Sequence, residues 1–329
     1  VVIAQLGFRW GDEAGKTGRG VSCSMASALL QRGTREKTRQ QIANEFSRLK
    51  ANAGVSGEGA SIQTTRENLP GALRLVAEVL RQANFPESEF EQLRTATLAA
   101  IEAQRSEPNA LAPVELQRHI NPYPKDHWLY NTSLEERIER VKNVQLSDVR
   151  ACYAELFGAS NSELAVVGDF DPEAVTRLAG ELFDDWKSPR KYVRIPSVHR
   201  DVKPLDRVIE TPDKANATFR AAMSLPLRDD HPDFPALVFG NYLLGGGPDS
   251  RLSMRIREKE GLSYSVFSYL NVSSQDEKAE FGISAIHAPQ NRERVEALVR
   301  EELRRALDSG FSEEEVAEMN FHLWYGFKR

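Results

Sequence analysis

The chain has 329 residues, of which 40% are hydrophobic and 28% are charged, as in ordinary globular proteins. This length is enough for about two domains with sizeable cores. The formal net charge of −5 argues against a nucleic-acid-binding surface, and no apolar run approaches the ~18 residues that a membrane span requires.

The first ~190 residues mix strand-like and helix-like segments, which predicts one α+β domain. In chain order we expect a strand (Val1–Arg9), a polar turn (Gly11–Gly20), two helices (Val21–Gln31 and Glu36–Leu49), a strand (Ala60–Thr65), three helices (Asn68–Gln82, Pro86–Ser106 and Leu111–Ile120), a loop (Asn121–Lys125), a helix (Ser147–Leu156), a buried strand (Leu164–Val167) and a helix from Pro172 to Phe183 capped by Asp171. The helix at Asn68–Gln82 has the clearest basis, because its apolar residues recur at i, i+3, i+4 and i+7.

A linker without apolar periodicity follows, and its prolines favour an extended chain. We place it at 193–204, between a first domain (1–192) and a second domain (205–329). The second domain is expected to contain strands at Arg207–Thr211, Ala217–Ser224, Ser263–Tyr269 and Lys278–Ile286, and helices at Pro235–Leu244 and Asn291–Leu307.

A capping box at Ser312–Glu315 predicts a last helix, running through Val316, Met319 and Leu323. The sequence then stops at Arg329 without a helix breaker. We therefore expect the second domain to be incomplete.

The densest group of special residues lies between positions 243 and 269, with the sequence LLGGGPDSRLSMRIREKEGLSYSVFSY. Gly245, Gly246 and Gly247 allow close backbone approach or a positive φ. A basic helix follows, with Asp249 or Ser250 as its cap and Gly261 at its end. Arg257 then supplies a fixed cation and Tyr264 a phenol donor, which suits a peptide carbonyl or a developing oxyanion. Neither side chain is a good general base, so these residues would bind or stabilise rather than activate water.

Other motifs are less informative about function. Gly11–Thr17 (GDEAGKT) has one residue too few for a phosphate-binding loop, so a solvated turn is expected there. None of the six histidines forms a His-x-x-x-His or His-x-x-Glu-His pair. Cys23 and Cys152 have no Cys or His at metal-ligand spacing, and two buried thiols are expected; a disulfide and a nucleophilic Cys23 are the alternatives.

The motif region closely resembles the pitrilysin/insulinase family of zinc peptidases, in its processing-peptidase-like branch. The resemblance extends over essentially the whole chain. Further matching segments are RGT at Arg32–Thr34, ENLPGALRLVAEVL at Glu67–Leu80, NPYPK at Asn121–Lys125, AVVGDFDPEAV at Ala165–Val175 and TPDKANA at Thr211–Ala217.

This resemblance implies an α+β fold with two homologous domains of the metallopeptidase-like, LuxS type. Each domain would be an antiparallel sheet flanked by helices, and the second would be truncated. The family's zinc site is an inverted His-x-x-Glu-His on a first-domain helix, with a further Glu about 70–80 residues on. Aligning Arg32–Thr34 with the family places this site at Ser24, Ser27 and Ala28, where no side chain can hold zinc. The downstream Glu would fall near Ala100, with Glu102 close by.

The chain therefore resembles the non-zinc subunit of a heterodimeric zinc metallopeptidase that hydrolyses peptides. By resemblance, Arg257 and Tyr264 would hold the substrate carbonyl, and Gly245, Gly246 and Gly247 would lie against the peptide. No cofactor is expected in this chain, because a homologous partner subunit would carry the zinc. Neither nucleic-acid binding nor membrane insertion is expected.

Two alternatives remain open. The chain is instead an inactive scaffold, core or peptide-binding subunit of a larger complex, or it hydrolyses peptides alone through an unrecognised nucleophile. We expect a bacterial periplasmic location, with the cytoplasm as the alternative.

Overall fold

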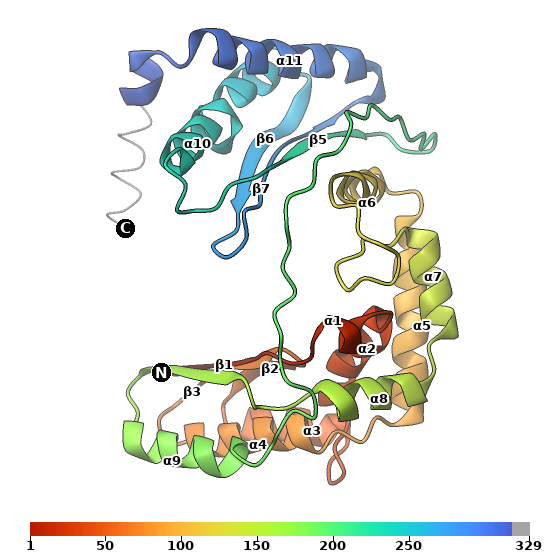
Figure 1. Cartoon of the computed structure of the whole chain (residues 1–329), viewed down its shortest axis with the longest axis vertical. Helices are drawn as coiled ribbons and strands as arrows, with labels where there is room; N and C mark the ends of the chain where they lie inside the picture. Colours follow the sequence, from red (N-terminus) through yellow and green to blue (C-terminus); the bar gives the residue numbers. More distant parts are fainter. Residues whose placement is uncertain (318–329) are drawn as a thin grey trace. The chain divides into compact units, whose positions relative to one another are not determined.

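The computed structural model describes residues 1–317, which form two compact units (Figure 1). The first unit comprises Val1–Glu102, Pro124–Trp128 and Glu135–Ile195, and the second comprises Ala103–Tyr123, Leu129–Leu134 and the chain from Pro196 onward. Residues 103–123 thus belong to the second unit, although the sequence analysis assigned them to the first domain. The boundaries 1–192 and 205–329 stay a prediction.

An antiparallel sheet with strand order β2-β3-β1-β4 organises the first unit. Its strands are β1 (Val2–Phe8), β2 (Asn52–Ser56), β3 (Gly59–Thr64) and β4 (Ser162–Gly168). Side chains alternate along β1, so that Val2, Ala4, Leu6 and Phe8 are buried while Ile3 and Gln5 are exposed. Such alternation is typical of a sheet with one face on a core.

Helices cover the buried face of this sheet, and Figure 1 shows α3, α4 and α9 along it. The helices up to residue 183, apart from α6, are α1 (Glu13–Lys16), α2 (Gly20–Leu29), α3 (Arg39–Arg48), α4 (Leu69–Arg81), α5 (Glu87–Gln104), α7 (Leu134–Asn143), α8 (Leu146–Leu156) and α9 (Pro172–Phe183), with a 3₁₀ turn η1 (Leu30–Arg32) after α2. The apolar periodicity predicted for α4 is confirmed, because Leu69, Leu73, Val76 and Leu80 are all buried.

A second antiparallel sheet, with strand order β5-β7-β6, organises the second unit. Its elements are β5 (Ala217–Leu225), β6 (Ser263–Val272), β7 (Ala279–His287), α10 (Phe234–Asn241), the π-helical turns η2 (Tyr242–Gly246) and η3 (Ser253–Lys259), the 3₁₀ turn η4 (Pro289–Asn291) and α11 (Arg292–Ser309). Side chains of α11 pack with Ile283 and Ala285 of β7 in the core. On the other face lies α6 (Pro108–Ile120), where Gln117 donates to Glu280 and Asn109 accepts from Thr218.

The predicted fold, two antiparallel sheets flanked by helices, is confirmed, with local differences. Residues 207–211 form no strand, although their sequence is rich in β-formers. The strand at Leu164–Val167 exists, but as the edge strand β4, with Val167 71% exposed, so its predicted burial is wrong. The sequence analysis missed β2 and α7. Of the last predicted helix, the capping box forms, since Ser312 and Glu315 bond reciprocally, whereas Met319 and Leu323 lie outside the described residues.

The expectation of two free buried thiols is wrong, because Cys23 and Cys152 form a disulfide. Their Cα atoms are 5.4 Å apart, within the usual range for a disulfide. Cys23 lies on α2 and Cys152 on α8, two helices that pack against each other. A separation of 129 residues hid this proximity from the sequence. The bond joins the helix that carries the degenerate zinc positions to a neighbouring helix.

Candidate functional site

The glycine-rich loop is packed against its own domain. A Cβ at Gly245 would lie 2.6 Å from the backbone N of Ser268 on β6, and one at Gly247 would lie 2.7 Å from the ring of Tyr242. Gly247 has φ of −99°, outside the left-handed region. Glycine is therefore required at 245 and 247 because the backbone packs closely against β6 and the Tyr242 ring of the same chain. Gly246 is exposed, and a Cβ there would lie 3.0 Å from the side-chain nitrogen and 3.2 Å from the backbone oxygen of Asn241.

Three arginines follow this loop: Arg251 is buried, Arg255 is half-buried and pairs with Glu260, and Arg257 is exposed. Arg251 forms a bidentate ion pair with Glu315, at 2.5 and 2.7 Å, and its guanidinium lies 4.4 Å from the ring centre of Phe311. The Arg251 guanidinium lowers the pKa of Glu315 to about 2, despite partial burial of that carboxyl. Arg251 is thus a structural residue that ties the start of the motif helix to the segment after α11.

Arg257 lies on η3 with its side chain 57% exposed. Its guanidinium contacts Glu258 at 3.3 Å, an exposed pair that contributes little to stability. Its backbone carbonyl accepts from Gly261, which has φ of +63° and ends the helix as predicted. The cation is therefore held at a helix end and faces solvent.

Tyr264 follows at the start of β6 and is 67% exposed. It sits at a register shift between β6 and β7, since Ser263 pairs with His287 and Ser265 with Ile286. Both predicted binding residues are thus exposed and close in sequence, on either side of the turn at Gly261. They are available to a molecule outside this domain.

The degenerate zinc positions lie on one side of α2, where Ser24 and Ala28 are exposed and Ser27 is half-buried. The hydroxyl of Ser27 accepts a hydrogen bond from Gly57 N–H at 2.8 Å, in the turn between β2 and β3. Two hydroxyls and a methyl group do not fit zinc, which takes thiolate, imidazole or carboxylate ligands. Among the described residues, no cluster of three or more His, Cys, Asp or Glu side chains is arranged to hold a metal ion. Glu102, the residue close to the expected position of the downstream Glu, is exposed and ends the segment Val1–Glu102 of the first unit.

An aromatic cluster next to this helix was not anticipated from the sequence. Trp10 donates from its indole N–H to the carbonyl of Gly57 at 2.7 Å. The ammonium of Lys16 lies 4.4 Å from the Trp10 ring centre and 5.0 Å from that of Trp128. Burial lowers the pKa of Lys16, and the Glu58 carboxylate opposes that shift. Lys16 of the GDEAGKT stretch therefore lies against two indole rings, an arrangement unlike that of a phosphate-binding lysine.

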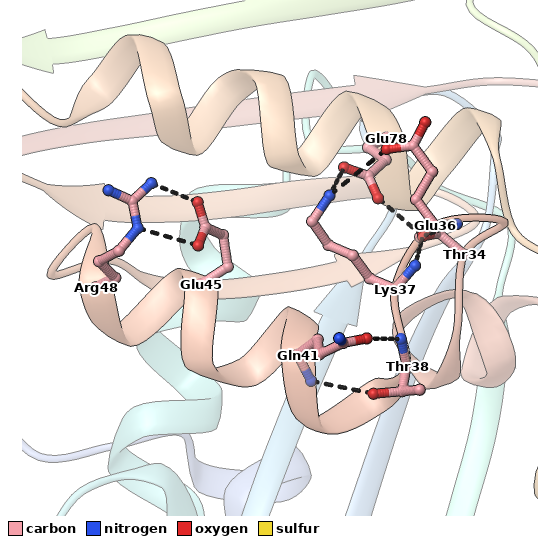
Figure 2. A network of polar contacts seen from close by, with 8 residues as sticks. All are labelled: Thr34, Glu36, Lys37, Thr38, Gln41, Glu45, Arg48 and Glu78. Atoms are coloured by element: carbon pink, nitrogen blue, oxygen red, sulfur yellow. Dashed lines mark hydrogen bonds and ion pairs between the residues drawn. The ribbon is translucent and has the colours of Figure 1, made fainter.

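The RGT segment has a structural role as well (Figure 2). Thr34 donates to Glu78 at 2.8 Å and accepts from the backbone N–H groups of Glu36 and Lys37. Lys37 reaches the other carboxylate oxygen of Glu78 at 2.6 Å, and this bond raises the pKa of Lys37. The network fixes the loop before α3 on α4.

Comparison with known proteins identifies the family. A family model described as the peptidase M16 inactive domain matches residues 143–320, more than half of the chain. The chain belongs to the peptidase M16 family. This confirms the family resemblance drawn from the sequence.

Related proteins are described in part as zinc proteases and in part as non-peptidase homologues. The non-peptidase homolog YmxG of Helicobacter pylori is 23% identical over 94% of this chain and 71% of its own length. An uncharacterized zinc protease of Rickettsia bellii is 24% identical over 95% of this chain and 74% of its own length. The crystal structure of a peptidase M16 inactive domain from Pseudomonas fluorescens has a TM-score of 0.83 and 24% identity, and the match covers 98% of this chain and 77% of that one. That likeness supports the M16 fold.

The described residues include no helix that is both long enough and apolar enough to cross a membrane.

Proposed function

We propose that this chain is an M16 subunit without hydrolytic activity of its own, acting as a scaffold or peptide-binding subunit of a larger complex. The observation that carries the proposal is the set of residues at the family's metal positions. Ser24, Ser27 and Ala28 replace the ligands and the base, and the Ser27 hydroxyl instead binds the turn at Gly57. The family model that matches, an inactive domain, agrees with it.

The test is hydrolysis by the isolated chain. The purified protein, with its zinc content measured, is incubated with quenched fluorescent casein. The proposal predicts substoichiometric zinc and no hydrolysis above the level of an Arg257→Ala/Tyr264→Phe double variant. Hydrolysis by the isolated chain that a metal chelator abolishes would contradict it.

A more specific function is favoured by the exposure of Arg257 and Tyr264. We propose that these two side chains complete the active site of a homologous zinc-binding subunit, which would supply the metal ion and the water that it activates. The Arg257 guanidinium and the Tyr264 hydroxyl would donate hydrogen bonds to the carbonyl oxygen of a bound peptide. Those bonds strengthen as negative charge develops on that oxygen, and the loss of one such donor lowers turnover by about 10²–10³-fold.

Tyr264→Phe tests this role, because it removes a single hydroxyl from an exposed side chain. In the complex with the zinc subunit, we expect kcat to fall by about 10²-fold while the complex still assembles. A matched control is Tyr192→Phe, which removes a phenol hydroxyl near the end of the first unit. Unchanged turnover by Tyr264→Phe would remove the catalytic role and leave the scaffold or peptide-binding function.

The same proposal includes a bacterial periplasmic location. Disulfides persist in oxidising compartments and are rare in the cytosol of mesophiles, and Cys23 and Cys152 are joined by one. Mass spectrometry of the protein trapped with an alkylating reagent in intact cells tests it. The proposal predicts that both cysteines resist alkylation, whereas labelling of both would favour the cytoplasm.

A further inference from the structure

A buried serine directly precedes the exposed tyrosine of the motif. Ser263 is 6% exposed, and its Oγ lies 2.7 Å from the carbonyl oxygen of Ile286 on β7. The same Oγ lies 2.8 Å from the carbonyl oxygen of Ser265 and accepts the N–H of Ser265 at 3.2 Å. One hydroxyl thus links Ser263 to Ser265 and also to the neighbouring strand β7.

Residues 263–265 form a β-bulge. Ser263 pairs with His287 and Ser265 with Ile286, so β6 uses two residues where β7 uses one. Tyr264 is the extra residue. A bulge bends the strand and re-aims the side chain that it carries.

The direction of Tyr264 depends on that bulge. In a regular strand, side chains two residues apart share a face, so Tyr264 would lie on the face of Val266. Val266 is 8% exposed and belongs to the core of the second unit, whereas Tyr264 is 67% exposed. The bulge is therefore what separates Tyr264 from the core-facing row.

We propose that Ser263 is a positioning residue, whose hydroxyl holds the bulge that presents Tyr264 to a bound peptide. The proposal rests on the function assigned to Tyr264 above, and it names the part of the chain that sets the geometry of that site. Without the hydroxyl, the N–H of Ser265 loses its side-chain acceptor, and the register of β6 can relax toward regular pairing. The phenol then moves away from its exposed position.

The direct test places 3-fluorotyrosine at position 264 and records its ¹⁹F resonance in the full chain. Relaxation by a soluble gadolinium chelate reports how exposed the ring is. We expect Ser263→Ala to shift the resonance and to lose much of this relaxation enhancement, and Ser263→Thr, which keeps the hydroxyl, to restore both. Ser284→Ala, which removes a buried hydroxyl from the neighbouring strand away from the bulge, is expected to change neither. An unchanged resonance in folded Ser263→Ala would overturn the proposal.

Turnover by the complex supplies the second measurement. Ser263→Ala is expected to lower kcat by about 10-fold or more, with KM little changed, because misplacing a positioned group weakens its contribution to the transition state. The double variant Ser263→Ala/Tyr264→Phe is expected to be no slower than Tyr264→Phe alone. Multiplied losses in the double variant would show that Ser263 acts independently of Tyr264, against the proposal.

The two readouts separate the two hypotheses. Equal turnover in Tyr264→Phe and wild type would end the catalytic role of Tyr264, whatever the ¹⁹F spectra show. A shifted resonance in Ser263→Ala would then still establish Ser263 as the residue that sets the direction of Tyr264.

Discussion

Removal of the disulfide is the perturbation whose effect on stability is best defined. Cys23→Ala/Cys152→Ala opens a covalent loop of 129 residues between α2 and α8. In the chain-entropy treatment, closing a loop of that length lowers the entropy of the unfolded chain by an amount worth about 5 kcal/mol at 25 °C. Measured losses for native disulfides are about 2–5 kcal/mol, so we expect a loss in that range. This is a large part of the ~5–15 kcal/mol that stabilises a typical folded domain.

Guanidinium unfolding, followed by circular dichroism, measures this loss. We expect the midpoint to fall in the double variant and in wild type treated with reductant, and to fall by similar amounts. Each single variant should behave like the double variant, because either one removes the cross-link. A midpoint that neither reductant nor the double substitution lowers would refute the disulfide and the stabilisation derived from it.

Three further perturbations have defined outcomes. Arg251 lowers the pKa of Glu315 to about 2, so the stabilisation from the ionised Glu315 is present above pH 4.5 and is lost as the pH falls toward 2. Glu315→Gln should therefore lower the free energy of unfolding by about 2–3 kcal/mol at pH 7, and urea unfolding should show this difference from wild type shrinking toward pH 2. Gly245→Ala places a Cβ against the β6 backbone and should lower the thermal midpoint, whereas Gly20→Ala meets no atom within 4 Å and should not; equal midpoints would contradict the packing described. Thr34→Val leaves two backbone N–H groups without their side-chain acceptor, so we expect about 1–3 kcal/mol of destabilisation in urea, and no loss would mean that water replaces the hydroxyl.

Local signals predicted much of the fold. The 3.6-residue spacing in α4 reflects the face that it buries, and Asp171 caps α9 by accepting from Ala174, as its position before Pro172 indicates. The glycine at 261 ends the motif helix because it has a positive φ. Each of these features depends on residues within one or two helical turns.

Features that depend on distant residues were missed. The pairing of Cys23 with Cys152 and the pairing of β2 with β3 follow from tertiary contacts that a short window does not contain. The segment 207–211 has strand-forming residues but no paired neighbour among the described residues, and strand propensity without a partner does not form a sheet.

The candidate site was proposed from the sequence as a fixed cation at Arg257 and a phenol donor at Tyr264. Both side chains are exposed, and their binding role stays a prediction. Close approach was anticipated for the glycines, but the packed neighbours of Gly245 and Gly247 belong to the chain itself. The role of Ser263 was not anticipated, because a bulge depends on the register of two strands and leaves no distinctive sequence pattern.

Purification of the chain from the cells that produce it, followed by mass spectrometry of what accompanies it, tests the central claim most directly. If Arg257 and Tyr264 complete the active site of a zinc-binding partner, the chain is expected with a stoichiometric partner of the same family that carries His-x-x-Glu-His and zinc, in a complex that hydrolyses peptides. A chain recovered alone, or with unrelated subunits and no zinc peptidase, would contradict that account.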